Sequence, residues 1–399
     1  MKKREIRSLL LVGVVLGALG CKRGDGSDPA GSRASGPVEI KVGQTMPYSG
    51  PASAYGTIGK VEAAYFVKLN KAGGVHGHRI NLISVDDGYS PARAVEQVRK
   101  LVEQDQVLFI FQSLGTPSNA AIQPYLNSNK VPQLFVATGA TRWGDPEHFP
   151  WTIGYNPSYE LEGRTYGKTI ASRPEDAKIG VLYQNDDYGK DMLKGLKQGL
   201  GARAKNVVAE VTYEVSDATV DSQIAMLKAS GADTFVNVTT PKFAAQAIRK
   251  AYDIGWKPRQ YLSNVSASVG SVLTPAGLDK AVGVYTVGYF KDPTDKQWDD
   301  DPAMKEWRAF MKEYMPDANL SDASNVYGYL AAQTLVQVLE QCGDDLSRAN
   351  VMKQATNLKG FAPGLLLSGI KIETAPNDYF PFDQLALVRF DGTTWVPAG

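Results

Sequence analysis

Two short segments of small polar residues each follow an apolar run in the first third of the chain. Residues 107–111 (VLFIF) precede residues 112–119 (QSLGTPSN), and residues 131–136 (VPQLFV) precede residues 137–141 (ATGAT). Each apolar run predicts a buried strand of a parallel sheet. Ligands of open α/β sheets bind beyond the carboxyl ends of the strands. Amides and hydroxyls at two neighbouring strand ends suit a small polar ligand, and nothing in these segments predicts catalysis.

Other patterns that could support catalysis are weak. Residues 163–169 (GRTYGKT) resemble a phosphate-binding loop, but the segment is one residue short and lies in a helical pattern rather than after a strand. His76 and His78 lie in a glycine-rich turn, where a solvated turn is favoured over a metal pair, and His148 lies in a loop segment. There is no nucleophile-elbow motif. We therefore predict neither an enzyme nor a cofactor, with a secreted α/β hydrolase or transferase as a weaker alternative.

The composition predicts a globular protein of two domains. The chain has 399 residues, of which 43% are hydrophobic and 21% charged, and its formal net charge is +1. Such a balance provides no electrostatic footprint for nucleic acid, so we expect no nucleic-acid partner.

The first 37 residues are predicted to be a targeting segment and a tether, and not part of the folded domains. Residues 1–20 are basic and then apolar, which predicts a secretory signal peptide. Cys21 follows Gly20 in a pattern similar to a bacterial lipobox, with Ala18 where the consensus prefers Leu. We expect Cys21 to be lipidated and to hold the protein at a membrane surface; a plain secretory signal is the alternative. Residues 21–37 form a flexible tether.

The only other cysteine is Cys342, at the end of an apolar helical run over residues 326–339. Once Cys21 carries the lipid, no internal disulfide can form. We expect Cys342 to be an inert, partly buried thiol.

Strand and helix patterns alternate from residue 38, and the alternation starts again after residue 155. Strands alternating with helices predict an α/β fold with mostly parallel sheets, here in two units with a ligand cleft between them. The first unit has predicted strands at 38–42, 79–85, 107–111 and 131–136, with helices at 55–70, 90–102 (Ser90 as N-cap) and 120–127. The second has helices at 158–172, 190–200, 220–229 and 243–254, with strands at 178–183, 207–213, 234–238 and 260–263.

Several motifs together resemble a known family. They are residues 48–51 (YSGP), 70–75 (NKAGGV), 86–87 (DD), 186–189 (DDYG) and 327–329 (YGY). In this order and spacing they are similar to the periplasmic substrate-binding proteins of branched-chain amino acid ABC transporters, over essentially the whole chain from residue 38.

The resemblance implies a type I periplasmic binding protein, with two Rossmann-like lobes joined by a three-strand hinge. Lobe one would hold residues 38–156 and 290–381, and lobe two residues 157–289 and 382–399. The protein would act as a monomer in the cell envelope, close on its ligand and deliver that ligand to the permease of an ABC transporter. An alternative function also fits the sequence: a sensory protein that presents its ligand to a receptor would have the same fold and cleft.

The resemblance also implies site residues. In lobe one, a ligand carboxylate would be held by backbone amides and hydroxyls at Ser113, Gly115, Thr116, Ala137, Thr138 and Gly139. Tyr55 and Tyr188 match cleft tyrosines, and Thr240 and Asn264 match positions where leucine-type members hold the ligand's ammonium group.

One departure from the family pattern bears on the ligand. The segment around Asn264, residues 263–266, contains no acid where leucine-type members have a glutamate. Either Glu160, Asp186 or Asp187 replaces that acid, or the ligand is a carboxylate or amide without an amine, such as an aromatic carboxylate. Both interpretations stay open.

Overall fold

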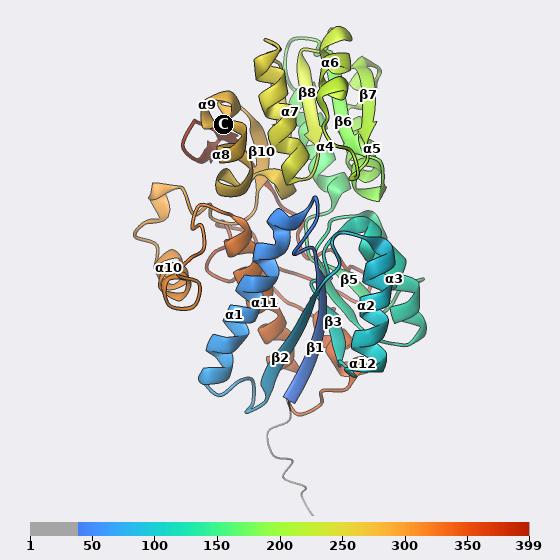
Figure 1. Ribbon diagram of the computed structural model, residues 1–399, viewed down its shortest axis with the longest axis vertical. Helices are drawn as coiled ribbons and strands as arrows, with labels where there is room; N and C mark the ends of the chain where they lie inside the picture. The colour runs from blue at the N-terminus through green and yellow to red at the C-terminus, as the bar shows by residue number, and fades with distance from the viewer. Residues whose placement is uncertain (1–38, 399) are drawn as a thin grey trace, which may run out of the picture. The chain divides into compact units, whose positions relative to one another are not determined.

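The computed structural model describes residues 39–398 (Figure 1). The predicted signal peptide, Cys21 and the tether therefore lie outside the described residues. Within residues 39–398, no helix has both the length and the apolar character to cross a membrane.

The first sheet has five parallel strands in the order β2-β1-β3-β4-β5. Phe109 and Phe111 pack with helices α1 and α11 in one core, whereas the intervening Ile110 packs with α2 and α3 in another. This alternation follows from the period of two in a strand. The strands are β1 (Glu39–Met46), β2 (Arg79–Asp86), β3 (Phe109–Phe111), β4 (Gln133–Val136) and β5 (Thr152–Gly154). The helices are α1 (Gly56–Lys71), α2 (Pro91–Glu103), α3 (Thr116–Ser128), α10 (Pro302–Tyr314), α11 (Ser324–Cys342) and α12 (Arg348–Ala355).

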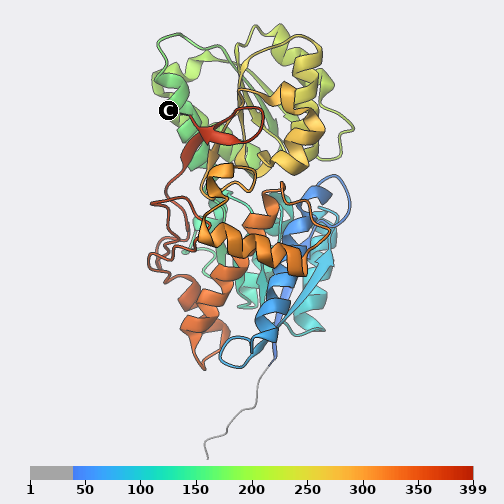
Figure 2. The ribbon, with the colours of Figure 1, turned by 90° about the vertical axis from the view of Figure 1, so that its left-hand side faces the viewer.

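The second sheet has seven strands in the order β12-β11-β10-β9-β8-β6-β7. Five of them are parallel, and β11 and β12 join the edge in antiparallel pairing, so that the red C-terminal hairpin lies beside β10 (Figure 2). The strands are β6 (Ile179–Gln184), β7 (Val207–Tyr213), β8 (Thr234–Val238), β9 (Arg259–Leu262), β10 (Tyr285–Gly288), β11 (Ala386–Phe390) and β12 (Trp395–Pro397). The helices are α4 (Tyr159–Ala171), α5 (Asp187–Leu200), α6 (Asp221–Ala229), α7 (Pro241–Asp253), α8 (Thr274–Ala276) and α9 (Leu278–Ala281).

The chain passes between the two sheets three times: after β5, after β10 and before β11. The α/β fold with two mostly parallel sheets is therefore as predicted. The residue boundaries proposed for the lobes remain a prediction.

Most predicted elements are present, and the differences have local causes. Helix α3 begins at Thr116 rather than at residue 120, because Gly115 takes a positive φ of 102° and Pro117 fits the first turn. Ser90 does occupy the N-cap position of α2, but its side chain makes no capping hydrogen bond. Strands β5 and β10 and helices α8, α9, α10 and α12 were not predicted.

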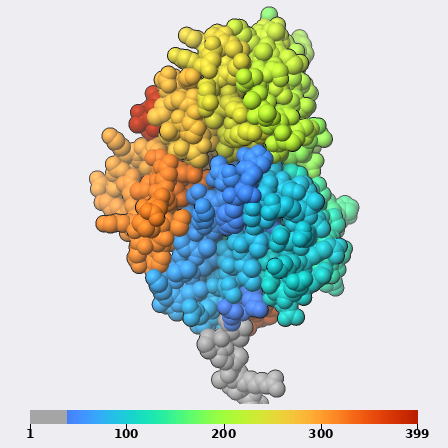
Figure 3. Space-filling model, in the orientation of Figure 1, coloured from blue at the N-terminus to red at the C-terminus, as the bar shows by residue number. Residues whose placement is uncertain are grey.

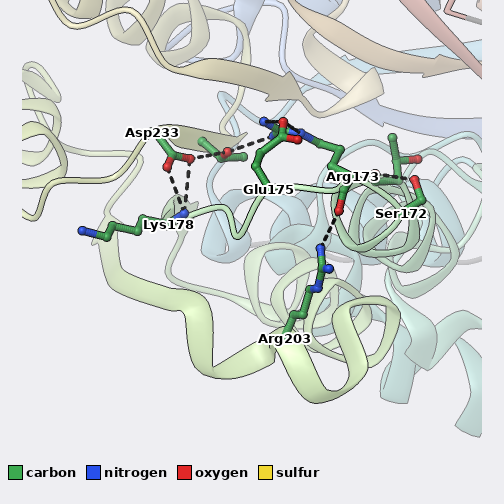
Figure 4. Close-up of polar contacts among 8 residues, drawn as sticks. Ser172, Arg173, Glu175, Lys178, Arg203 and Asp233 are labelled. Carbon is green, nitrogen blue, oxygen red and sulfur yellow. Dashed lines mark hydrogen bonds and ion pairs between the residues drawn. The ribbon is translucent and has the colours of Figure 1, made fainter.

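Charged side chains cluster on the segment between α4 and β6 (Figure 4). The Arg173 guanidinium contacts Glu175 and donates to the Thr234 hydroxyl, while Arg203 Nη1 donates to the Arg173 carbonyl at 2.7 Å. The Lys178 amide donates to the Asp233 carboxylate at 3.2 Å. These contacts hold the chain that leads into β6, so we assign the network a structural role.

Candidate functional site

A cavity of about 80 Å³ lies between segments of the two sheets. The first sheet contributes the segments that follow β3 and β4, and the second sheet contributes the starts of α4, α5 and α7 together with the segment after β9. Its lining residues are Tyr55, Ile58, Tyr89, Leu114, Gly115, Thr116, Ala137, Thr138, Asn156, Tyr159, Tyr188, Thr240, Asn264, Val265, Ser268, Tyr289, Phe290, Ala323, Ser324 and Tyr327.

The wall on the first sheet (the first wall: Leu114–Thr116 and Ala137–Thr138) is built from the two predicted polar segments. Gly115 is the N-cap of α3, so the N–H groups of the first turn of α3 lack intrahelical acceptors and suit an anion. A Cβ on Gly115 would lie 2.6 Å from the Tyr89 ring, so only glycine fits there. The hydroxyls of Thr116 and Thr138 lie 2.5 Å apart, which joins the two strand ends by a hydrogen bond.

Two predicted site residues lie behind this wall. The Ser113 hydroxyl accepts a hydrogen bond from the Thr45 amide at 3.1 Å, and the residue is buried. The Gly139 carbonyl accepts from the Tyr159 amide at 2.8 Å. Neither residue lines the cavity, so both support the wall rather than face the cavity. The other eight predicted site residues (Tyr55, Gly115, Thr116, Ala137, Thr138, Tyr188, Thr240 and Asn264) do line it.

The wall on the second sheet (the second wall: Tyr159, Tyr188, Thr240 and Asn264) is aromatic and neutral. The rings of Tyr159 and Tyr188 lie 4.6 Å apart, and the Tyr188 hydroxyl donates to the Thr239 carbonyl at 3.4 Å. Thr240 is the N-cap of α7, and its amide donates to the Tyr213 hydroxyl at 2.9 Å.

Glu162 lies directly behind Asn264 and was missed by sequence reasoning. It is fully buried on α4 and accepts hydrogen bonds from the Asn264 amide at 2.8 Å, from the Asn264 side chain and from the Tyr166 hydroxyl at 2.7 Å. Burial raises the pKa of Glu162 to about 7. The only local signal was an acid among apolar positions of the helix. Its link to residue 264, 102 positions away, is purely tertiary.

Polar contacts at and near the cavity join segments that flank the first wall to segments that flank the second. The Tyr55 hydroxyl donates to the Val265 carbonyl at 3.0 Å, and the Ser268 hydroxyl donates to Asp322 at 2.8 Å. The Thr141 amide and hydroxyl both donate to Asp191, at 2.7 and 2.9 Å. On the face shown in Figure 3, atoms of the dark-blue segment before α1 meet those of the second-sheet segments. The walls are therefore closed on each other.

This arrangement agrees with comparisons to known proteins. The family model described as "Periplasmic binding protein" matches residues 39–394. The chain belongs to the periplasmic binding protein family. The predicted membership of a periplasmic binding protein family is thereby confirmed.

Individual members of this family show how far the likeness extends. "Leu/Ile/Val-binding protein homolog 1" of Brucella abortus is 25% identical over 324 residues, which cover 79% of this chain and 83% of the relative. A branched-chain amino acid ABC transporter protein from Thermus thermophilus, solved with bound valine, has a TM-score of 0.80 at 18% identity and covers 91% of this chain and 96% of its own. A solute-binding protein from R. palustris in complex with benzoate has a TM-score of 0.76 at 20% identity and covers 90% and 96%.

The three acids that could replace the missing glutamate of this periplasmic binding protein are engaged elsewhere. Glu160 pairs with Lys194 at 2.5 Å, and Asp187 pairs with Arg142 at 3.0 Å. Asp186 caps α5 by accepting from the Gly189 amide at 3.3 Å and also accepts from the Gln184 side chain at 2.6 Å. Burial raises the pKa of Asp186 to about 6.

No Asp, Glu, Lys, Arg or His stands among the residues that line the cavity in the described part of the chain. A charged ammonium group buried there would have no carboxylate partner, which is costly. A carboxylate, by contrast, is stabilised by amides and hydroxyls without a basic residue.

The structure also places the other candidate residues of the sequence. Residues 163–169 lie inside α4, not in a loop after a strand. Among residues 39–398, no group of three or more His, Cys, Asp or Glu could hold a metal ion. The Cys342 thiol is buried at the end of α11, and burial raises its pKa to about 11, so that it is unreactive at neutral pH.

Proposed function

We propose that this periplasmic binding protein captures a small carboxylate or amide in the cavity between its two walls. The observation that carries the proposal is the pairing of the α3 N-terminus and two threonine hydroxyls with a cavity lining that has no charged side chain. This lining favours an anion without an amine over an α-amino acid. Of valine and benzoate, the ligands bound in the two solved structures described above, benzoate fits this chemistry better.

The ligand is then delivered to the permease of an ABC transporter, outside the cytoplasm. The lobes, residues 38–156 with 290–381 and residues 157–289 with 382–399, open and close about the hinge. A ligand shifts that equilibrium only by binding the closed form better. Lipid on Cys21 holds the protein at the membrane surface. The protein is no enzyme, and we expect each bound compound to be recovered unchanged.

A thermal-shift panel tests this proposal. The purified protein is unfolded and refolded to strip any bound ligand, then screened with aliphatic and aromatic α-amino acids, aromatic carboxylates, amides and urea. A ligand at ~100 times its dissociation constant adds about 2.7 kcal/mol to the free energy of unfolding. We expect stabilisation by amine-free carboxylates. Stabilisation by leucine or valine alone would overturn the proposed ligand class, and no stabilisation by any compound would overturn the proposed function.

A further inference from the structure

A second and larger cavity adjoins the first. It has a volume of about 300 Å³ and lies between the C-terminal hairpin β11–β12, the end of β10 and the segments that follow β10. This is the side of the molecule that Figure 2 presents, with the hairpin in red and the segments after β10 in orange. Its lining is mainly apolar and includes Val287, Trp298, Leu367, Leu387, Val388 and Trp395.

The two cavities share a stretch of wall. Five residues line both of them: Asn264, Ser268, Tyr289, Phe290 and Ala323. Tyr289 is buried and is held between two rings, 4.8 Å from Phe290 and 4.8 Å from Phe382. Phe290 is only half-buried and has Tyr289 as its one close ring neighbour among the described residues. Phe290 is thus a shared lining residue with few ring contacts, and we expect its side chain to turn when a ligand spans both cavities.

The polar groups around the second cavity already have partners. Asp292 accepts from the Thr294 amide at 2.8 Å, and Asp295 accepts from the Gln297 amide at 3.0 Å. The Trp395 indole N–H donates to the Ala267 carbonyl at 2.8 Å. Asp292 and Asp295 line one part of the cavity, and most of the remaining lining is hydrocarbon and aromatic ring. Burying an apolar group against that part is favourable.

Gly288 leaves part of this space open. It is the last residue of β10, and a Cβ built on it would meet nothing closer than Leu367 Cδ1 at 3.9 Å and Val388 Cγ2 at 4.0 Å, both from lining residues. Most other glycines with ordinary φ angles in the described part of the chain would bring a Cβ within about 3 Å of a neighbour. A Cβ at position 288 would thus fit beside these lining residues without displacing them.

We propose that the second cavity takes the apolar tail of a ligand whose carboxylate lies in the first cavity. The ligand is then an amphiphilic monocarboxylate with an unbranched or aromatic tail, rather than a compact acid. The inference rests on the proposed function, because the head group is placed by the first wall.

Calorimetric titration of the purified protein with straight-chain monocarboxylates from propionate to decanoate tests the inference. For the wild-type protein we expect the affinity to rise about fourfold with each added methylene until the second cavity is filled. Two variants fill that cavity from neighbouring strands: Gly288→Leu, and Ala386→Leu at the position paired with Gly288 in β11. We expect either variant to bind the short acids like the wild type and to lose the gain from the longer tails.

Ala225→Leu is the matched control, because it adds the same side chain at an exposed position of α6. It should follow the wild-type series. An affinity for decanoate no greater than that for propionate would overturn the second cavity as a tail site and leave the proposed function standing. Equal losses for short and long acids in both filled variants would also overturn it. Failure of every carboxylate to bind the wild-type protein would overturn the carboxylate as the ligand's head group, and with it this inference.

Discussion

The two walls of the first cavity differ in how their polar groups are supported. The first wall presents glycine and threonine at the ends of two neighbouring strands, and its hydroxyls bond to each other. The second wall presents tyrosine rings and the Asn264 amide, and behind that amide lies the buried carboxylate of Glu162. The first wall is thus suited to an anion, while the second keeps the Glu162 carboxylate covered.

This contrast concerns whether the ligand of this protein carries an amine. Glu162 is within hydrogen-bond distance of Asn264 but does not line the cavity. The Asn264 side chain therefore keeps the second wall neutral, and without it the exposed Glu162 carboxylate could bind an ammonium group. Four substitutions test this view of the two walls.

The largest effect is expected from Gly115→Ala on the first wall. The φ of 102° costs roughly 1–3 kcal/mol for a residue with a side chain, and the new methyl would overlap the Tyr89 ring. We expect a lower melting temperature and no thermal shift with carboxylates. Gly255→Ala is the control, because it has a φ of 68° with no atom within 4 Å of the new Cβ. It should lose stability but keep the full thermal shift; a full shift in Gly115→Ala would refute the role of the first wall.

Glu162→Gln should change how the stability of the second wall depends on pH. A carboxyl group with a pKa of about 7 when folded and about 4.3 when unfolded favours folding while it is protonated. Its contribution is complete below about pH 4.3 and is lost as the pH rises through 7. We therefore expect the free energy of unfolding of the variant, relative to wild type, to increase by about 3 kcal/mol between about pH 4.5 and about pH 7.5.

Urea denaturation at both pH values measures this difference. Tyr166→Phe provides a second variant, since it removes a hydrogen bond that lowers the pKa of Glu162 and should steepen the loss of stability. A constant difference between Glu162→Gln and wild type across this range would show that Glu162 does not titrate there.

Asn264→Ala should convert the second wall into an ammonium site. Removing the amide uncovers Glu162, and a hydrogen bond to a charged group contributes about 1.5–3 kcal/mol. We expect the affinity for leucine or phenylalanine, measured by calorimetry, to increase roughly 10- to 100-fold. The double variant Asn264→Ala/Glu162→Gln should cancel this gain. A gain that persists in the double variant would mean that another group binds the amine.

The smallest effect is expected from Tyr55→Phe, which removes the hydrogen bond between the walls at Val265. The closed form should lose about 0.5–1.5 kcal/mol, so carboxylate affinity should fall roughly 2- to 10-fold. Tyr125→Phe is the control, because its hydroxyl bonds to Glu103 on the surface. Equal losses in both variants would show that the Tyr55 hydroxyl has no special role in closure.

The two walls differ in how well the sequence predicted them, because the residues of the first wall follow strands directly whereas the second wall depends on contacts between distant segments. The first wall could be read from the sequence because its residues directly follow apolar strands, and parallel strands end at one edge of a sheet. Even there, Ser113 and Gly139 were expected at the ligand and instead support the wall. The start of α3 was placed four residues late, since the sequence pattern did not reveal that Gly115 takes a positive φ.

The second wall could not be read in the same way. The acids considered for this wall were Glu160, Asp186 and Asp187, but the carboxylate bonded to Asn264 is Glu162. It lies on α4, two residues after Glu160, where a helix and a strand end from distant parts of the chain pack together. The second cavity was not predicted at all, because it forms where β10, β11 and the segments after β10 leave a gap around Gly288.

The sequence by itself indicated the α/β alternation and the polar strand ends, because apolar period and turn chemistry are local properties of the chain. The family was indicated by the resemblance of its motifs. Only the tertiary structure decided which acids are paired on the surface, which carboxylate is buried behind the site and where a second cavity remains. Those features depend on which side chains from distant segments come into contact, and no local sequence pattern specifies those contacts.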